Sequence, residues 1–368
     1  MYITMLSPPA PPRSVQVLLG SRRYWVEIGP GLIETVGLKL RRLDLQGSVA
    51  VITDDNVRSL YGQTVLNSLA EAGFRALTYS VQPGERAKSL PEIEQLAESL
   101  ARDAMDRSSI AVALGGGVIG DLAGFLAAIY YRGIPLIQIP TSIMAQVDSA
   151  VGGKTAVNLR AGKNLVGAFY QPRLVLADTL TLRSLGRREW NEGFAEIIKY
   201  GVIRSPALFS TLEEDEPLDI DGIVEACVQI KADIVAEDEF ETSGRRALLN
   251  FGHTLGHAIE AAAGYGRLYH GEAISLGMCA AAFISRKRAG LSAEEVTRLE
   301  VLLEKFSLPT QLPPELSPDQ IIERTFADKK FVRGQIRFVL ASRLGHAFVS
   351  DEVTREDLIE AVAYLQSS

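Results

Sequence analysis

Strand-like and helix-like patterns alternate along the first half of the chain. Apolar runs flank Gly20-Ser21 between positions 15 and 28, which predicts a β-hairpin. Expected strands then lie at 48–53, 76–81 and 110–114, with expected helices between them at 57–72 and 90–102. Parallel strands require such helical crossovers, so we expect an open α/β sheet with a ligand site at the carboxyl ends of its strands.

Long amphipathic stretches replace the strand pattern in the second half. They lie at 188–203, 220–236, 248–263, 272–289 and 293–306. A proline-rich connector at 309–318, a hairpin around 336–349 and a final helix complete the predicted elements. We therefore predict an α/β domain over residues 1–185 and a mainly helical domain over residues 186–368.

The composition and the net charge limit the kinds of molecule that we expect the protein to bind. The 368 residues are 47% hydrophobic and 23% charged, which excludes wholesale disorder and allows a large core. A net charge of −7 argues against nucleic-acid or anionic-membrane surfaces and favours a small-molecule partner. Cys227 and Cys279 lie in apolar helical patterns, so we expect buried thiols, no disulfide framework and a reducing, cytoplasmic location. We expect neither a secretory signal nor a transmembrane segment.

A glycine-rich loop follows the strand expected at 110–114. Gly115-Gly116-Gly117-Val118-Ile119-Gly120-Asp121 contains G-x-G-x-x-G between a predicted strand and a predicted helix, a context in which glycines let a pyrophosphate approach backbone N–H groups. The simpler interpretation is a tight turn in a packed sheet. A standard dinucleotide site has its acidic residue about twenty positions after the glycines, whereas Asp54 precedes them here. A second loop, from Pro83 to Lys88, could add the Glu85 carboxylate and an amine.

Three of the four histidines lie within eighteen residues of one another. His253 and His257 are one helical turn apart, and His270 follows a glycine-rich turn. Catalytic zinc needs about three protein ligands, so two of these histidines and one carboxylate would suffice. Glu196, in an otherwise apolar helix, is the best carboxylate, although it could instead be a surface group paired with Lys199 or Tyr200. The pattern leaves open which two histidines bind the metal and which one acts as acid or base.

Polar and glycine-rich segments connect the two halves. They comprise Pro140-Thr141-Ser142, Gln146-Val147-Asp148-Ser149, Gly152-Gly153-Lys154-Thr155 and Gly162-Lys163-Asn164-Leu165. Lysines beside glycines are typical of phosphate or carboxylate binding, although a solvated loop would show the same composition. Arg132 and Arg246 extend this set of possible anion ligands.

As an ordered set, these motifs resemble the 3-dehydroquinate synthase family of sugar-phosphate cyclases. The similarity runs from about position 15 to 349 and includes the glycine loop, the segment 145–154, Gly162-Lys163-Asn164, the segment 195–200, the segment 250–260 and His270-Gly271-Glu272. The resemblance implies an α/β Rossmann-like NAD-binding domain followed by an all-α metal-binding domain. It also implies NAD and Zn2+ or Co2+ as cofactors, a small-molecule sugar phosphate as substrate and a homodimer.

The resemblance assigns roles residue by residue. Glu196, His253 and His270 would bind the metal, and His257 would support them or act as the acid–base group. The matching substrate positions are Asp148, Lys154, Asn164, Lys199, Arg246, Asn250 and either Lys329 or Lys330, with Arg132 reaching the phosphate from the neighbouring subunit. The matching NAD positions are Asp54, Glu85, Lys88, Gly116, Gly117, Asp121, Thr141, Ser142, Lys154, Lys163, Thr181, Leu182 and Glu189. Threonine is commoner than serine at position 142 in the family, but Ser142 keeps the hydroxyl.

The implied reaction converts 3-deoxy-D-arabino-heptulosonate 7-phosphate to 3-dehydroquinate and phosphate. Transient oxidation by NAD acidifies a C–H bond, phosphate leaves by elimination, the ketone is reduced again, and an intramolecular aldol reaction closes the ring. A valiolone or deoxy-inosose synthase is one alternative, disfavoured by the carboxylate-binding set that includes Arg246 and Asn250. A polyol dehydrogenase of the glycerol dehydrogenase type would not need the cations Lys154, Arg132 and Arg246. An inactive NAD-binding sensor would carry a broken metal triad.

Overall fold

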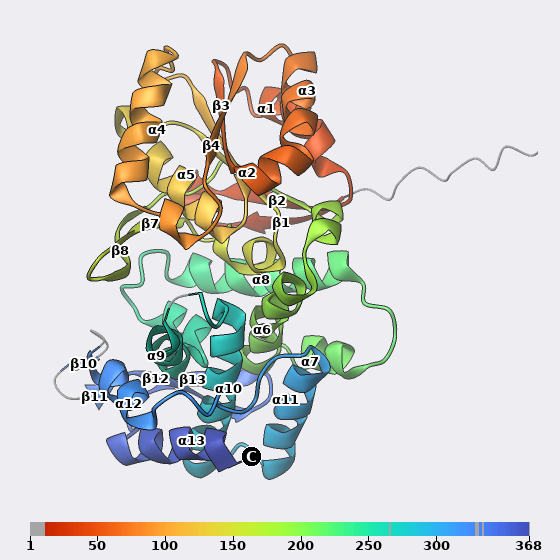
Figure 1. The fold of residues 1–368 in the computed structure, drawn as a ribbon. Coiled ribbons are helices and arrows are strands. Elements are labelled where there is room, and N and C mark those ends of the chain that lie inside the picture. Colours follow the sequence, from red (N-terminus) through yellow and green to blue (C-terminus); the bar gives the residue numbers. More distant parts are fainter. Residues whose placement is uncertain (1–11, 265, 328–330, 333–334, 368) are drawn as a thin grey trace, which may run out of the picture. The chain divides into compact units, whose positions relative to one another are not determined.

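The computed structural model describes residues 12–264, 266–327, 331–332 and 335–367 (Figure 1). The chain forms two compact units. One comprises Met1–Thr141 with Gly153–Arg183, and the other comprises Ser142–Gly152 with Ser184–Ser368. The short segment Ser142–Gly152 therefore belongs with the second unit, although sequence on both sides of it belongs to the first. The predicted boundary at residue 185 stays a prediction.

A seven-stranded sheet in the order β1-β2-β9-β6-β5-β3-β4 forms the centre of the first unit. Its strands are β1 Arg13–Val17, β2 Tyr24–Gly29, β3 Val49–Asp54, β4 Ala76–Val81, β5 Ile110–Gly115, β6 Leu136–Pro140 and β9 Leu174–Asp178. Only the β1–β2 pair is antiparallel, and it is the hairpin predicted around Gly20-Ser21. The strands predicted at 48–53, 76–81 and 110–114 are confirmed, and so is the α/β class.

Helices cover both faces of this sheet. Helices α1 (Val36–Arg42) and α3 (Gln63–Glu71) pack on one face, and α4 (Leu90–Arg102) and α5 (Gly117–Ile129) pack on the other (Figure 1). Side chains alternate along a strand. Val49 and Val51 of β3 therefore point into the core under α1 and α3, while Ala50 and Ile52 point into the core under α4 and α5. A strand buried on both faces reads as a continuous apolar run, which is why β3 and β5 could be recognised from sequence.

Other parts of the first unit differ from the predicted elements. The helix predicted at 57–72 is divided into α2 (Asp55–Val57), a π-helical turn (Arg58–Gly62) and α3. A separate antiparallel hairpin, β7 (Lys154–Leu159) with β8 (Gly162–Phe169), occupies a stretch in which the sequence pattern predicted no strands, only anion-binding segments or a solvated loop. The remaining short helices of this region are Gly20–Arg22, Leu32–Thr35, Glu85–Ala87, Tyr130–Arg132 and Thr179–Ser184.

The second unit is mainly helical, as predicted. Its elements are the π-helical turn η6 Ala145–Ser149, α6 Arg187–Ile203, α7 Pro206–Glu213, α8 Ile220–Glu237, the 3-10 helix η8 Arg245–Asn250, α9 His253–Ala263, α10 His270–Arg288, α11 Ala293–Lys305, α12 Pro318–Ala327, α13 Arg355–Ser367 and the short strands β10 Phe331–Val332, β11 Gln335–Ile336, β12 Phe338–Arg343 and β13 His346–Ser350. Strands β12 and β13 form the hairpin predicted around 336–349. Cys227 and Cys279 are buried free thiols, as expected.

The predicted helix at 248–263 is wrong at its start. Gly252 adopts φ +78°, a left-handed conformation that interrupts the helix, so η8 ends at Asn250 and α9 begins at His253. A side chain at Gly252 would also meet Met278 of α10, with the nearest atom only 2.6 Å from its Cβ. The break therefore positions His253 at the first turn of a new helix, packed against α10.

Glycines allow α9 and α10 to approach each other closely. A Cβ added to Gly277 would lie 1.9 Å from the carbonyl oxygen of Gly252, and one added to Gly256 would lie 2.8 Å from Ile274. This packing holds the start of α10, with His270, beside the helix that carries His253 and His257. Within the part of the chain that the structure describes, no helix is both long and apolar enough to cross a membrane.

Candidate active site

Three helices of the second unit bring four potential metal ligands together. His253 and His257 come from α9, His270 begins α10, and Glu196 lies in the middle of α6. Each histidine offers a ring nitrogen, and these nitrogens lie within 4.8 Å of one another. Glu196 Oε1 is 3.3 Å from His253 Nε2 and 3.7 Å from His270 Nε2. The sequence-predicted carboxylate and histidines thus converge on one point.

These separations fit a metal ion. With metal–ligand bonds of about 2.1 Å, neighbouring ligands of a tetrahedral ion lie about 3.4 Å apart. The distances from Glu196 Oε1 to the Nε2 atoms of His253 and His270 are close to this value. Carboxylate and imidazole are ligands that zinc and cobalt accept. The three groups are therefore suited to bind such an ion while leaving a coordination position open.

Glu196 is a buried carboxylate, with only 1% of its surface exposed. Burial alone would raise its pKa, but Lys199, one turn further along α6, forms an ion pair with it, and His253 adds to the attraction. The pKa of Glu196 is therefore held well below its usual value, and the group is ionised at neutral pH. The alternative of a surface carboxylate is wrong, although the pairing with Lys199 that it proposed is present.

The three histidines differ in their surroundings. Burial lowers the pKa of His253, whose Nδ1 lies 3.1 Å from the carbonyl oxygen of Phe251. Burial would also lower the pKa of His270, but contacts with Glu196 and Glu260 outweigh it and raise that pKa to about 9. His257 is exposed, and its ring centre lies 5.3 Å from that of His253. Of the three, His257 is therefore the one that solvent or a substrate reaches most readily.

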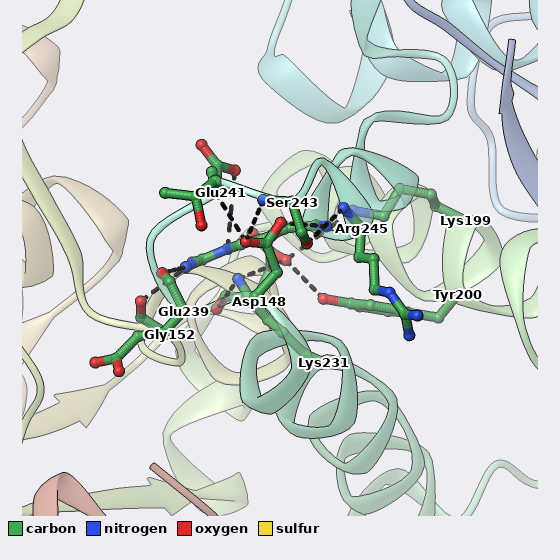
Figure 2. A network of polar contacts seen from close by, with 12 residues as sticks. Asp148, Gly152, Lys199, Tyr200, Lys231, Glu239, Glu241, Ser243 and Arg245 are labelled. Atoms are coloured by element: carbon green, nitrogen blue, oxygen red, sulfur yellow. Dashed lines mark hydrogen bonds and ion pairs between the residues drawn. The ribbon is translucent and has the colours of Figure 1, made fainter.

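A network of polar contacts surrounds Asp148, in the π-helical turn Ala145–Ser149 (Figure 2). Its Oδ1 accepts hydrogen bonds from the Tyr200 hydroxyl at 2.6 Å and from Lys231 Nζ at 2.8 Å, and Lys199 Nζ lies 4.0 Å away. Burial opposes ionisation of Asp148, but Lys231 and Lys199 lower its pKa to about 2. Burial also lowers the pKa of Lys231 to about 8. Lys199 thus joins the Asp148 network to the Glu196 cluster.

Lys231 is a residue that the sequence interpretation missed. It lies in α8 with 5% of its surface exposed, and Nζ also donates to the main-chain oxygen of Asp148 at 2.7 Å. The available signal was a lysine on the apolar face of an amphipathic helix. A lysine whose stem alone packs on apolar surface gives the same pattern, so the signal was weak.

Arg246 is fully buried and bound to nearby main chain. Its guanidinium donates to the carbonyl oxygens of Glu239, at 2.8 Å, and Gly152, at 3.1 Å, and its Nε lies 3.8 Å from Glu241. Gly152 has φ +94°, and a Cβ there would lie 2.6 Å from the guanidinium. Arg246 therefore joins the Gly152 segment to the loop that follows α8, and Asn250 lies one turn further along η8.

In the first unit, several predicted nucleotide-binding residues lie at the carboxyl ends of adjacent parallel strands. Asp54 ends β3, Gly116 and Gly117 follow β5, and Thr141 follows β6. Helix α5 begins at Gly117 without a side-chain cap, so the backbone N–H groups of its first turn face an edge suited to a phosphate. Asp54 accepts hydrogen bonds from the N–H groups of Asn56 and Val57. The sheet edge therefore places backbone donors suited to a phosphate near the Asp54 carboxylate, although the acidic residue precedes the glycines in sequence.

The loop after β4 reaches the same region. Lys88 is buried and forms an ion pair with Asp121 of α5. Glu85 accepts a hydrogen bond from the Asn158 amide at 2.8 Å and lies 4.0 Å from Lys163 Nζ. The structure therefore brings the second predicted loop, the glycine loop and the β7–β8 hairpin together.

The other predicted residues have varied positions. Thr181 and Leu182 are buried just after β9, and Lys154 is exposed at the start of β7. Asn164, with φ +58°, and Arg132, with φ +66°, both adopt left-handed conformations.

In the second unit, the Ser142 hydroxyl accepts a hydrogen bond from Ala145 N, and Glu189 accepts one from the Tyr269 hydroxyl at 3.1 Å. Lys329 and Lys330 lie outside the described residues.

Models of two family domains match consecutive segments of the chain. "3-dehydroquinate synthase N-terminal" matches residues 78–192, and "3-dehydroquinate synthase C-terminal" matches residues 193–331. The chain belongs to the 3-dehydroquinate synthase family. The 3-dehydroquinate synthase of Desulforamulus reducens is 43% identical over 95% of this chain and 99% of its own. That of Ruegeria pomeroyi is 46% identical over 94% of this chain and 97% of its own.

Solved structures of other sugar-phosphate cyclases share the fold of this 3-dehydroquinate synthase family member. A 2-deoxy-scyllo-inosose synthase complexed with carbaglucose-6-phosphate, NAD+ and Co2+ matches with TM-score 0.84 and 26% identity over 96% of this chain and 99% of its own. A 2-epi-5-epi-valiolone synthase from Streptomyces hygroscopicus with NAD+ and Zn2+ bound matches with TM-score 0.85 and 27% identity over 93% and 96%. The glycerol dehydrogenase of Schizosaccharomyces pombe, at 18% identity and TM-score 0.65, shares the fold alone.

Proposed function

We propose that the protein is a 3-dehydroquinate synthase that uses a bound metal ion and recycled NAD to convert 3-deoxy-D-arabino-heptulosonate 7-phosphate to 3-dehydroquinate and phosphate. Its activity would be that of a phosphate-eliminating carbon–oxygen lyase, and relatives at 43% and 46% identity are named 3-dehydroquinate synthase. The structural observation that supports the proposal best is the convergence of ionised Glu196 with His253 and His270. A sensor without catalysis would not need this buried cluster.

We assign Glu196, His253 and His270 as the ligands of Zn2+ or Co2+. The sheet edge formed by Asp54, the glycine loop and the loop with Glu85 would bind NAD, as would the other matching positions named above. When bound, the metal polarises a substrate oxygen, and the nicotinamide accepts and returns a hydride. The two cyclases with bound NAD+ and Co2+ or Zn2+ support this cofactor assignment.

The remaining residues bind substrate and transfer protons. The reaction needs cations for a phosphate and a carboxylate, and Lys199 and Lys231 are cations held in place by Asp148. Lys154, Asn164, Asn250 and Arg246 complete the proposed substrate set, together with Arg132 from the neighbouring subunit and one of the two late lysines. His257 is exposed beside the cluster, so it can exchange protons with substrate and solvent.

Three further assignments belong to the proposal. We propose that the protein is a homodimer, because the assigned role of Arg132 requires a second subunit. We propose a cytoplasmic location, supported by two buried free cysteines. We also propose that the α/β part, to about residue 185, binds NAD and that the helical part binds the metal.

The experiment measures phosphate, dehydroquinate and net NADH from purified protein supplied with heptulosonate phosphate, NAD and zinc. Glu196→Ala is the test variant, because it removes the carboxylate ligand. We expect equimolar phosphate and dehydroquinate without accumulating NADH, and loss of both products in the variant. Net NADH from a polyol without phosphate release would instead indicate a dehydrogenase. Turnover of another sugar phosphate alone would indicate a valiolone or deoxy-inosose synthase.

A further inference from the structure

We propose that Glu260 is a positioning residue for the metal centre: its carboxylate accepts the Nδ1 proton of His270 and thereby directs Nε2 of that ring at the metal. The inference rests on the proposed metal centre and adds to it a residue outside the ligand set. Glu260 Oε2 lies 3.2 Å from His270 Nδ1, and Glu260 is 6% exposed. It lies on α9, the helix that carries His253 and His257.

The position of Glu260 follows from helical geometry. Residues 253, 257 and 260 of α9 are spaced four and three positions apart, so they share one face of the helix. That face meets the first turn of α10, where His270 lies. A buried carboxylate costs free energy unless a donor or a cation compensates it. The imidazole of His270 is such a donor.

The hydrogen bond fixes the tautomer of the neutral His270 ring, the form in which this ring can bind a metal. An ionised carboxylate only accepts hydrogen bonds, so the imidazole nitrogen that faces Glu260 must carry the proton. In neutral imidazole the other nitrogen, Nε2, then holds a lone pair, and Nε2 is the atom that lies 3.7 Å from Glu196 Oε1. A histidine that binds a metal through one nitrogen commonly donates from the other to a carboxylate or a carbonyl, which raises its basicity.

His253 provides an internal comparison. Its Nδ1 lies 3.1 Å from the carbonyl oxygen of Phe251, a neutral acceptor, while Nε2 faces Glu196. Both histidines therefore present Nε2 to the same point. They differ in the charge of the group behind them, because His270 alone is paired with a carboxylate in this way. We infer that Glu260 makes His270 the more electron-rich of the two histidine ligands.

The test measures Co2+ binding to metal-depleted full-length protein through the visible absorption bands of bound Co2+. Glu260→Gln keeps a hydrogen-bond acceptor but loses the charge, and Glu260→Ala loses both. We expect the Kd for Co2+ to rise about 10-fold in the first variant and up to about 100-fold in the second, with shifted absorption bands in both. Glu300→Gln is the matched control, because Glu300 accepts a hydrogen bond from Tyr364 in another part of this unit. Its Kd should equal that of the parent.

The possible results distinguish the role of Glu260 from the existence of the metal centre. Normal Co2+ binding by the parent with unchanged Kd and spectrum in both Glu260 variants would overturn the role of Glu260 and leave the centre standing. Absence of Co2+ binding by the parent itself would overturn the centre and the inference together. If Glu260→Ala fails to fold, Glu260→Gln decides alone. A purely structural role would lower the stability of that variant without moving the Co2+ bands.

Discussion

Several ionisable residues of the helical unit lie buried close together, and this arrangement of single residues indicates a functional site. Glu196 and Lys199 are each 1% exposed, and Lys231 is 5% exposed. Removing such charges from water is costly, so their retention needs a compensating arrangement or a function. Mutual pairing supplies part of the compensation, and a metal ion would supply the rest. Perturbed pKa values in such a cluster are typical of functional sites.

We expect the ion pair between Asp148 and Lys231 to contribute to the free energy of unfolding. Lys231→Met removes the cation that donates to Asp148 at 2.8 Å, and we expect a loss of unfolding free energy of about 2–3 kcal/mol, because 26% of the Asp148 side chain still reaches solvent. Asp148→Asn combined with Lys231→Met should cost less than the sum, with a coupling of about 1–2 kcal/mol in urea unfolding. Strictly additive effects would show that the two groups do not interact.

Sequence reasoning identified some site residues and missed others for physical reasons. The histidines stood out because the chain has only four, and Glu196 stood out because its helix is otherwise apolar. Lys231 and Glu260 carried no comparable signal, since a charge on a helix face looks the same whether its end group reaches water or a buried partner. Their pairing with Asp148 and His270 became visible only once the elements were packed.

At the scale of elements, the contact between α9 and α10 sets the spacing of the histidines. Gly277→Ala would place a Cβ 1.9 Å from the carbonyl oxygen of Gly252, so the helices must separate. We expect a loss of about 1–3 kcal/mol in urea unfolding, typical of overpacking, together with weaker Co2+ binding. Gly62→Ala is the control, because its φ is −57° and its nearest contact would be 3.4 Å from the new Cβ. Equal stability of the two variants would contradict this account.

We expect the free energy of unfolding to depend on pH through Asp357, in the first turn of α13. Asp357 accepts hydrogen bonds from Thr354 and contacts Arg288 and Lys287, which together outweigh burial and lower its pKa to about 2 from 3.8. A lowered pKa stabilises the fold above the unfolded value and loses this effect as pH falls through the folded value. Asp357→Asn should therefore cost about 1–2 kcal/mol at pH 7 and pH 5, a difference that shrinks below about pH 4.

Urea unfolding of Asp357→Asn and the parent at several pH values measures this difference. Asp215→Asn is a suitable control, because Asp215 is fully exposed and pairs only with Lys305 among the ion pairs of the described residues. It should leave stability nearly unchanged at every pH. A constant penalty for Asp357→Asn from pH 7 down to pH 3 would mean that its charge is not what stabilises α13.

Element predictions succeeded where burial on both faces gave an unambiguous pattern, as in β3 and β5. They failed where exposed residues interrupted the apolar run that marks a strand. Residues of β8 are exposed or half-buried throughout, so no apolar run marks that strand. The break before α9 depends on a positive φ at Gly252, and a glycine within an amphipathic stretch does not by itself indicate one.

At the scale of the whole molecule, the fold is more widely shared than the reaction. Cyclases that are 26% and 27% identical superpose with TM-scores of 0.84 and 0.85, whereas a glycerol dehydrogenase reaches 0.65. Function therefore depends on the site that each chain places on this fold. In this chain the proposed site combines the Glu196–histidine cluster with buried cations, and that combination suits a phosphorylated substrate.

The alternation of strands and helices was enough to predict the fold class, but it could not reveal that Ser142–Gly152 belongs with the helical unit. That grouping follows from partners far away in sequence, since Lys231 and Arg246 bind Asp148 and Gly152. Local patterns carry no information about such distant contacts.

Metal binding should stabilise the folded chain. A ligand that binds only the native state adds about 2.7 kcal/mol of unfolding free energy at 100 times its Kd. We expect Zn2+ to raise the unfolding temperature of metal-depleted protein and to leave Glu196→Ala nearly unchanged. Thermal unfolding followed by circular dichroism, with and without Zn2+, measures both. An equal rise in the variant would place the bound zinc elsewhere.

The most direct test of the central claim is a crystal structure of the zinc-loaded protein with anomalous scattering recorded at the zinc edge. We expect one strong peak, with Glu196 and the Nε2 atoms of His253 and His270 at about 2.0–2.2 Å from the ion. A peak bound by the three histidines, with Glu196 paired to Lys199 alone, would contradict the ligand assignment. No peak near Glu196 would contradict the metal centre itself.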